Sequence, residues 1–254
     1  MVIALITDFG TRDHFVAAMK GTILSINPSA VIVDITHEID PQNRREAAFT
    51  LAACYRDFPT ATVFVAVVDP GVGSDRRGIA VEGGGYYFVG PDNGVLSPAL
   101  KHESKVVELN RPEYFSERVS NTFHGRDIFA PVAAYISKGM WLEEFGPTIY
   151  DPVLLDHSKP QKSGDSLTGE IIHIDRFGNL ITNLTRDDLP EKFTIRLGSQ
   201  VIGNHCRSYS EAGRGEIITI MGSSEYLEIA ANLASAEQLT NAKVGQPVRL
   251  TPEN

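Results

Sequence analysis

The sequence predicts an α/β fold, in which an N-terminal, sandwich-like α/β domain with a mostly parallel sheet precedes a smaller, all-β, barrel-like domain. The first half alternates short β-rich runs with amphipathic helical stretches, whereas the second half contains short β runs joined by Gly, Asn and Asp turns. A length of 254 residues suits one large domain or two unequal ones. We expect domains at residues 1–150 and 166–254, joined by a linker at 151–165 that is rich in Pro, Asp, Ser and Lys.

The first domain begins with a βαβ pattern. Phe15, Met19 and Ile23 recur at helical spacing between two β-rich runs. A second helix is expected to begin after Asp40, a candidate N-cap, and the fully apolar run that follows is typical of a strand buried on both faces. The expected strands are 3–6, 31–35, 62–68, 77–81 and 86–89, with a hairpin connection at 82–85, and the expected helices cover 15–24, 41–56 and 127–138.

The second domain shows little helical periodicity. Its β runs are short and are separated by turn residues, which favours a small barrel or sandwich of about 90 residues. The expected strands are 167–174, 180–182, 193–197, 216–221, 226–230 and 247–250.

Composition excludes several classes of protein. The hydrophobic fraction of 42% and the charged fraction of 22% are those of an ordinary globular chain, and the formal charge of −9 without a basic cluster argues against a nucleic-acid partner. No apolar run approaches the ~20 residues that cross a bilayer, and the chain starts directly in a β run, so we expect a cytoplasmic protein without membrane contact. Cys54 and Cys206 lie far apart and are expected to be reduced, structural thiols.

Two polar clusters follow strands of the first domain, where α/β sheets bind ligands. Asp8 comes directly after the first strand and is placed to accept hydrogen bonds from a ribose diol, or else to cap the following helix. Asp69 follows the apolar strand and is separated from Arg76 by a Pro/Gly-rich loop. The two side chains are expected to hold a water or an anion, or to form a structural ion pair across a turn.

His124 stands at the expected start of the last helix of this domain. A helix N-terminus disfavours the cationic form of the ring, so we expect a neutral imidazole near pH 7; the other six histidines have no such setting. A metal site built from Asp8, Asp69 and His124 is formally possible, but no metal-ligand spacing supports it. The segment 90–94 is interpreted as a turn.

Three segments of the second domain combine carboxylate, aromatic, amide or hydroxyl groups. Asp175, Phe177 and Asn179 lie within five residues, a combination that suits an amino group and a heteroaromatic ring, or a simple β-turn. Tyr209 is placed either to stack on a planar base or to pack in the core. Hydroxyls just before a strand come from Ser223 and Ser224, and Glu228 follows within that strand.

In this order the motifs resemble the S-adenosyl-L-methionine (SAM) hydrolases that form adenosine, also called SAM hydroxide adenosyltransferases, which are relatives of the fluorinases and chlorinases. The resemblance covers nearly the whole chain and rests on Ile6-Thr7-Asp8-Phe9-Gly10, Asp69-Pro70-Gly71-Val72-Gly73, Gly90-Pro91-Asp92-Asn93-Gly94, Phe123-His124-Gly125-Arg126-Asp127, Asp175-Arg176-Phe177-Gly178-Asn179 and Tyr226-Leu227-Glu228-Ile229-Ala230.

The resemblance implies that water or hydroxide displaces L-methionine from ribose C5′ of SAM, without a metal or other cofactor. It places the catalytic roles on Asp69, Arg76 and His124. It also implies that Asp8 binds the ribose hydroxyls, that Asn179 and Phe177 meet the adenine, and that Tyr209 stacks on it. It further implies that the methionine portion is bound by Asp175, Ser223, Ser224 and Glu228. Members of the family are similar in being homotrimers, with each site formed by the N-terminal lobe of one subunit and the C-terminal lobe of its neighbour.

This chain also departs from its relatives. The related halogenases lack the Asp, Arg and His set and carry Ser where this chain has Gly125, which makes halide chemistry the less favoured alternative. Glu225 stands where many relatives have Gly, and Arg176 leads directly into Phe177 where the halogenases insert Pro. A third hypothesis is a protein that binds a purine nucleoside or SAM without turnover.

Overall fold

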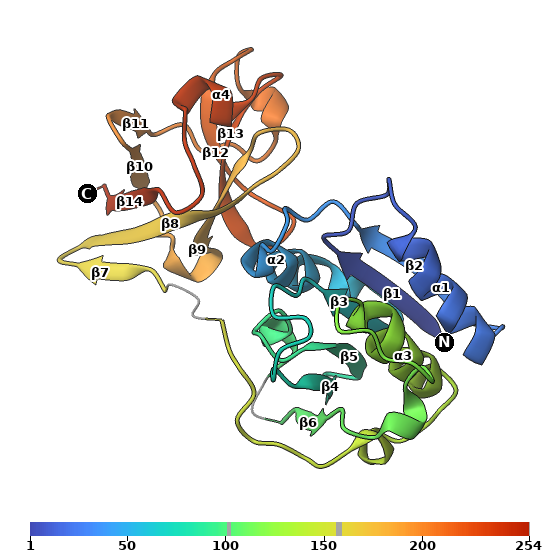
Figure 1. The fold of residues 1–254 in the computed structure, drawn as a ribbon. Helices are drawn as coiled ribbons and strands as arrows, with labels where there is room; N and C mark the ends of the chain where they lie inside the picture. The colour runs from blue at the N-terminus through green and yellow to red at the C-terminus, as the bar shows by residue number, and fades with distance from the viewer. Residues whose placement is uncertain (101–102, 156–158, 254) are drawn as a thin grey trace. The chain divides into compact units, whose positions relative to one another are not determined.

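The computed structural model describes residues 1–100, 103–155 and 159–253. The chain divides into two compact units, Met1–Leu155 and Asp156–Asn254, each built around a sheet (Figure 1). The first unit is mixed α/β and the second is mostly β, so the predicted fold class is confirmed.

The first unit contains a six-stranded sheet. The strands are β1 (Val2–Thr7), β2 (Val31–Thr36), β3 (Val63–Val67), β4 (Gly78–Gly83), β5 (Tyr86–Pro91) and β6 (Lys105–Glu108). They lie in the order β2-β1-β3-β5-β4-β6. The pairs β1·β2, β1·β3 and β3·β5 are parallel, whereas β4 runs antiparallel to both β5 and β6. The carboxyl ends of β1 and β3 therefore meet at one edge of the sheet.

Helices cover both faces of this sheet. Successive side chains of a strand point to opposite faces, so Ile3 and Leu5 share a core with α1 (Phe15–Ile26) and α3 (Ala130–Ser137). Ala4 and Ile6 belong to a second core that includes α2 (Arg44–Cys54). Nearly every side chain of β1 and β3 is buried, which confirms the prediction made for the apolar run that forms β3.

Two helices begin differently from their predictions. Helix α2 starts at Arg44 and is capped by Asn43, whose side chain accepts a hydrogen bond from the backbone N–H of Glu46 at 3.2 Å, so the assignment of Asp40 as N-cap is wrong. The reason is a turn closed by a bond from Asn43 N to Asp40 O, which delays the helix. The last helix starts with a π-helical turn, Gly125–Phe129, that continues into α3.

The second unit is one curled, mainly antiparallel sheet. Its strands are β7 (Gln161–Ser163), β8 (Ser166–Ile174), β9 (Leu180–Thr185), β10 (Phe193–Leu197), β11 (Gln200–Ile202), β12 (Ile217–Met221), β13 (Tyr226–Ala231) and β14 (Pro247–Pro252). They follow the order β11-β10-β14-β8-β9-β13-β12, with β7 beside β8. The backbone N–H of Thr219 donates to Asn204 O, and Cys206 N donates to Thr219 O, so the segment after β11 is joined to β12 and the sheet closes like a barrel.

Some elements had no sequence prediction: β6, β7, β11 and the short helix α4 (Ala236–Thr240). Strand β7 lies within the segment that was expected to be a linker. Short 3-10 turns occur at Tyr55–Asp57, Ser97–Ala99, Pro112–Tyr114, Leu142–Phe145, Arg186–Asp188 and Tyr209–Glu211. Across the described residues, no helix has the length and apolar character needed to cross a membrane.

Candidate active site

A cavity of about 290 Å³ lies at the carboxyl ends of β1 and β3. Its lining comes from the loops that follow these strands, from residues 122–125 at the start of the π-helical turn, and from Gln42. Asp8, Asp69 and His124 all belong to this lining, so the sheet brings together three of the predicted site residues that are far apart in the sequence.

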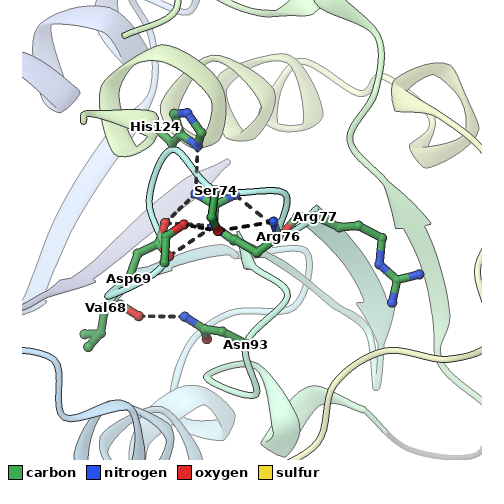
Figure 2. Close-up of polar contacts among 8 residues, drawn as sticks. Val68, Asp69, Ser74, Arg76, Arg77, Asn93 and His124 are labelled. Carbon is green, nitrogen blue, oxygen red and sulfur yellow. Dashed lines mark hydrogen bonds and ion pairs between the residues drawn. The ribbon is translucent and has the colours of Figure 1, made fainter. Parts of the chain in front are cut away.

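Arg76 connects Asp69 to His124 (Figure 2). Its Nε lies 3.0 Å from both carboxylate oxygens of Asp69, and its Nη2 donates to Oδ2 of the same carboxylate. The same Nη2 lies 2.7 Å from Nδ1 of His124. The side chains of Asp69 and Arg76 are only 6% and 11% exposed. A buried guanidinium that binds its carboxylate through two nitrogens fixes the orientation of both groups.

Hydrogen bonds within the loop between Asp69 and Arg76 define its shape. Ser74 Oγ donates to Gly71 O at 2.6 Å and accepts from Arg76 N at 3.3 Å. Gly73 has a φ of +77°, and a Cβ at this position would lie 2.2 Å from the carbonyl oxygen of Asn121. Only glycine fits this close approach between the loop and the segment that leads to His124.

His124 is held as a hydrogen-bond acceptor. Because Arg76 donates to Nδ1, the neutral ring carries its proton on Nε2. Burial lowers the pKa of His124 below its ordinary value of 6.5, and the charge of Arg76 lowers it further, against the opposing charges of Asp69 and Asp127. The expected neutral imidazole therefore agrees with the structure, although burial and Arg76 are the main causes.

Asp8 lies in the loop after β1. Its Oδ2 accepts a hydrogen bond from the backbone N–H of Gln42 at 2.8 Å. Helix α1 begins at Phe15 with His14 as its N-cap, so the alternative that Asp8 caps this helix is wrong. Asp8 instead belongs to the lining of the cavity.

The neighbouring Arg77 belongs to a separate, structural cluster. Its guanidinium binds the buried carboxylate of Asp92 at 2.7 Å and that of Asp151 at 2.9 Å. The other oxygen of Asp92 accepts from the backbone N–H of Val153. Asn93 donates to Val68 O at 2.9 Å and accepts from Val95 N. Gly90 and Pro91 belong to β5, so the interpretation of 90–94 as a turn is correct only for the bend at 92–94.

In the second unit, Asp175 organises the turn between β8 and β9. Its Oδ1 accepts from the backbone N–H groups of Phe177 and Asn179, and its Oδ2 accepts from the side chain of Asn179 at 2.8 Å. The β-turn interpretation is thus correct, and it presents Phe177 with 77% of its surface exposed.

Tyr209 and Glu228 form a second polar pair in this unit. The Tyr209 hydroxyl donates to Glu228 Oε2 at 3.2 Å, while 43% of the tyrosine remains exposed, so its interpretation as a core residue is wrong. Burial raises the pKa of Tyr209 to about 12, and the charge of Glu228 adds to this effect. Burial and the charge of Asp175 raise the pKa of Glu228, which the bond from Tyr209 only partly offsets.

Ser223 and Ser224 lie in the turn before β13. Ser223 is exposed and Ser224 is half-buried. Glu225 closes this turn with a φ of +65°, in the left-handed region that favours glycine. Glu225 also lies 3.8 Å from Arg186 in an exposed ion pair.

Several contributors to the cavity were not predicted as site residues. Gln42 supplies a backbone N–H from a left-handed conformation with φ of +67°, and Phe9 and Phe123 supply apolar walls. A buried network behind Asp8, centred on His37, was also missed. Within residues 1–100, 103–155 and 159–253, no three His, Cys, Asp or Glu side chains are grouped in a way that could hold a metal ion.

Fold and site together define a two-unit α/β protein with a carboxylate, a guanidinium and an imidazole clustered at the carboxyl ends of parallel strands. Models of the N-terminal and C-terminal domains of the SAM hydroxide adenosyltransferases match residues 3–146 and 169–249. The chain belongs to this family.

Individual proteins are similar over almost the whole length. An (R)-S-adenosyl-L-methionine hydrolase of Salinispora arenicola is 37% identical across 98% of this chain and 97% of its own. A fluorinase of Nocardia brasiliensis is 29% identical across 98% and 96%. The crystal structure of an uncharacterized conserved protein from Thermotoga maritima superposes with a TM-score of 0.90, covering 99% of this chain and 100% of that one, and the two sequences are 36% identical.

Proposed function

We propose that this protein hydrolyses SAM to adenosine and L-methionine. The observation that carries the proposal is the linked set of Asp69, Arg76 and His124 beside a cavity, in a chain that is 37% identical to a SAM hydrolase over nearly its full length. The fluorinase relative makes halide transfer to C5′ the alternative to be tested.

The reaction is a substitution at ribose C5′. The oxygen of water forms a bond to C5′, the bond from C5′ to sulfur breaks with its electron pair going to sulfur, and one proton is released. The neutral thioether is a good leaving group, so the protein needs mainly to position water in line with the breaking bond. Positioning of this kind is worth roughly 7–11 kcal/mol.

Asp69 and His124 hold the attacking water in this proposal, because both line the cavity. Arg76 fixes the two side chains relative to one another through its bonds to Oδ2 and Nδ1. Asp8, at the same cavity, binds the ribose hydroxyls, since a carboxylate accepts hydrogen bonds from two neighbouring hydroxyls.

Residues of the second unit bind the two ends of the substrate. The exposed ring of Phe177 and the amide of Asn179 meet the adenine, and the half-exposed ring of Tyr209 stacks on it. Carboxylates suit the cationic amino group and sulfonium of the methionine portion, which assigns that portion to Asp175 and Glu228. Ser223 and Ser224 assist them.

We further propose a homotrimer in which the first unit of one subunit and the second unit of its neighbour form each site, and a reaction that needs no cofactor. Family resemblance supports both. The cytoplasmic location expected from the sequence stays a prediction that cell fractionation would test.

Purified protein incubated with SAM and analysed by chromatography tests the function. The (R) sulfonium diastereomer should be tried first because the Salinispora relative's name specifies it, with the (S) form as comparison. Adenosine and methionine in equal amounts, at a rate unchanged by EDTA, support the proposal. Chlorinated adenosine formed in chloride without adenosine would indicate a halogenase, and tight adenosine binding without release of methionine would indicate a binding protein.

A further inference from the structure

We propose that His37 is a positioning residue for Asp8 and thereby sets how strongly the protein distinguishes a ribose from a sugar that lacks the 2′- and 3′-hydroxyls. This inference rests on the proposed function, in which Asp8 binds the ribose. His37 follows β2 and is only 5% exposed. It does not line the cavity as Asp8 does.

His37 holds the loop that carries Asp8 from both sides. Its Nδ1 lies 2.8 Å from Oγ1 of Thr7, and its backbone carbonyl accepts from Gly10 N at 2.7 Å. Thr7 and Gly10 flank Asp8 and Phe9 in the sequence. One imidazole residue therefore fixes the start and the end of the short segment that presents the carboxylate.

The groups on the two sides of the ring define the direction of the hydrogen bonds. Nε2 of His37 faces the carboxylate of Asp34, which can only accept, so the neutral ring carries its proton on Nε2. Nδ1 then accepts the proton of Thr7 Oγ1, which itself accepts from Phe9 N at 3.3 Å. The hydroxyl of Thr7 is fully buried, so this bond is not exchanged with water.

The far side of the ring is oriented by charge. Nε2 of His37 lies 3.0 Å from Asp34 Oδ1 but is not aligned as a hydrogen-bond donor, and Asp34 Oδ2 accepts from Lys20 Nζ at 2.6 Å. Burial raises the pKa of Asp34, but its interactions with Lys20 and His37 outweigh burial and lower the pKa overall. The contacts thus run from Lys20 at the surface through Asp34 and His37 to Thr7, at the start of the loop that carries Asp8.

Asp8 itself retains acceptor capacity for a ligand. The described bond to its carboxylate comes from Gln42 N and uses one site on Oδ2, whereas a carboxylate offers about four. Two hydrogen bonds to a diol demand both oxygens in a fixed place. A displacement of about 1 Å is enough to lose such an arrangement.

The experiment compares the binding of adenosine and 2′,3′-dideoxyadenosine by calorimetry. We expect the wild-type protein to prefer adenosine by about 10- to 100-fold, the range for hydrogen bonds to a charged group. Thr7→Val removes the bond to His37, together with the bond from Phe9 N, with little change in volume, and His37→Leu removes the ring. In both variants the affinity for adenosine should be at most about twofold higher than that for the dideoxynucleoside. His37→Asn places an acceptor near the position of Nδ1 and should restore part of the preference. Thr36→Val is the matched control and should keep the preference for adenosine. Thr36 lies at the end of β2, and its Oγ1 accepts a hydrogen bond from Glu38 N.

A double-mutant cycle with Asp8→Ala separates positioning from general stability. If His37 acts through Asp8, adding Thr7→Val or His37→Leu to Asp8→Ala leaves adenosine affinity unchanged. Weakening of both nucleosides by the same factor, or additive losses in the double variants, would overturn the inference, as would a wild-type protein without preference for adenosine. A wild-type protein that prefers adenosine but does not cleave SAM would overturn the proposed hydrolysis and leave the inference standing.

Discussion

The bond from Arg76 to Asp69 is the contact on which the proposed chemistry depends most directly. Asp69→Asn keeps the size of the side chain but removes its charge and one of the oxygen acceptors for the guanidinium. We expect the rate of SAM hydrolysis to fall by at least ~10²-fold, the lower end for a group that assists proton transfer. Methionine release under saturating substrate would measure it.

Asp151→Asn is the matched control for this substitution. Asp151 pairs with the adjacent arginine, Arg77, but it is 79% exposed and lies outside the cavity lining. Its loss should change the rate by less than about twofold, because exposed ion pairs contribute little. Equal losses in the two variants would mean that Asp69 serves only to hold its loop.

The state of His124 predicts how activity depends on pH. Its pKa lies below 6.5 because of burial and of Arg76, so the neutral ring that accepts from Arg76 persists at neutral pH and is lost only in more acidic solution. We expect kcat/KM to fall with an acid limb whose midpoint lies below 6.5. In His124→Asn, which keeps an acceptor for Arg76 but does not titrate, this limb should disappear; if it persists, another group causes it.

The same shift affects stability in a defined direction. Since the folded state holds His124 neutral more strongly than the unfolded chain does, its contribution is complete above 6.5 and decreases as the pH falls toward the lowered pKa. Denaturation of wild type and His124→Asn at pH 8 and at pH 5.5 would reveal a smaller difference between the two pH values in the variant.

At the scale of residues, the sequence identifies site residues that directly follow a strand, but it does not identify site residues whose role depends on tertiary contacts. Asp8 and Asp69 were found because each comes directly after an apolar run. His37 had no such signal, since its role depends on Thr7, 30 positions away. Gln42 acts through its backbone in a left-handed conformation, which its residue type does not reveal.

At the scale of elements, strong hydrophobic patterns located β1, β3, β8 and β13 well. The four-residue β6 and the three-residue β11 offered too few residues to show a period. The start of α2 was misplaced because Asp40 and Asn43 are both good caps, and only the turn between them decides which one serves.

Two glycines, one in the loop between β3 and β4 and one in the turn between β4 and β5, should respond differently to substitution. Gly73 and Gly84 both have positive φ, but a Cβ meets the backbone of Asn121 at Gly73 and open space at Gly84. We expect Gly84→Ala to lower the free energy of unfolding by about 1 kcal/mol and Gly73→Ala by about 2–4 kcal/mol, because the clash adds to the backbone strain. Chemical denaturation would measure both.

Activity should separate these two variants as well. Displacement of the loop at Gly73 moves Asp69 and Arg76 relative to His124, so Gly73→Ala should lower the hydrolysis rate under conditions in which it remains folded. Gly84→Ala, in the hairpin turn between β4 and β5, should not. Equal stability of the two variants would mean that the segment around Asn121 yields readily.

At the scale of the whole molecule, the proposed trimer makes a prediction about mixed subunits. Asp69→Asn inactivates the first unit and Asp175→Asn the second, so each variant alone should be inactive. Coproduced in one cell, they should form trimers in which some sites combine two intact units, with about a quarter of wild-type activity for random mixing. Sites contained within single subunits would give no recovery.

The order of motifs along the chain was the most informative feature at this scale. Single motifs such as Asp-Pro-Gly or Gly-Asn are ordinary turns, and several of them indeed form turns here. Their succession over both units indicated the family, which the domain models then matched over residues 3–146 and 169–249. The proposed assembly has no comparable pattern in the sequence, because a surface that contacts a neighbour needs no fixed spacing.

The two adjacent arginines of the first unit limit how its gene can change. Figure 2 shows that Arg76 points to Asp69 and His124 and that Arg77 points away from them. Arg77 binds Asp92 and Asp151 instead. A deletion that shifts this segment by one position would place Arg77 where Arg76 binds Asp69 and His124, and would leave Asp92 and Asp151 without their arginine. We therefore expect this segment to tolerate substitution of exposed residues such as Asp75 but not insertions or deletions. A library of variants that differ in the length of the segment should contain almost no active proteins.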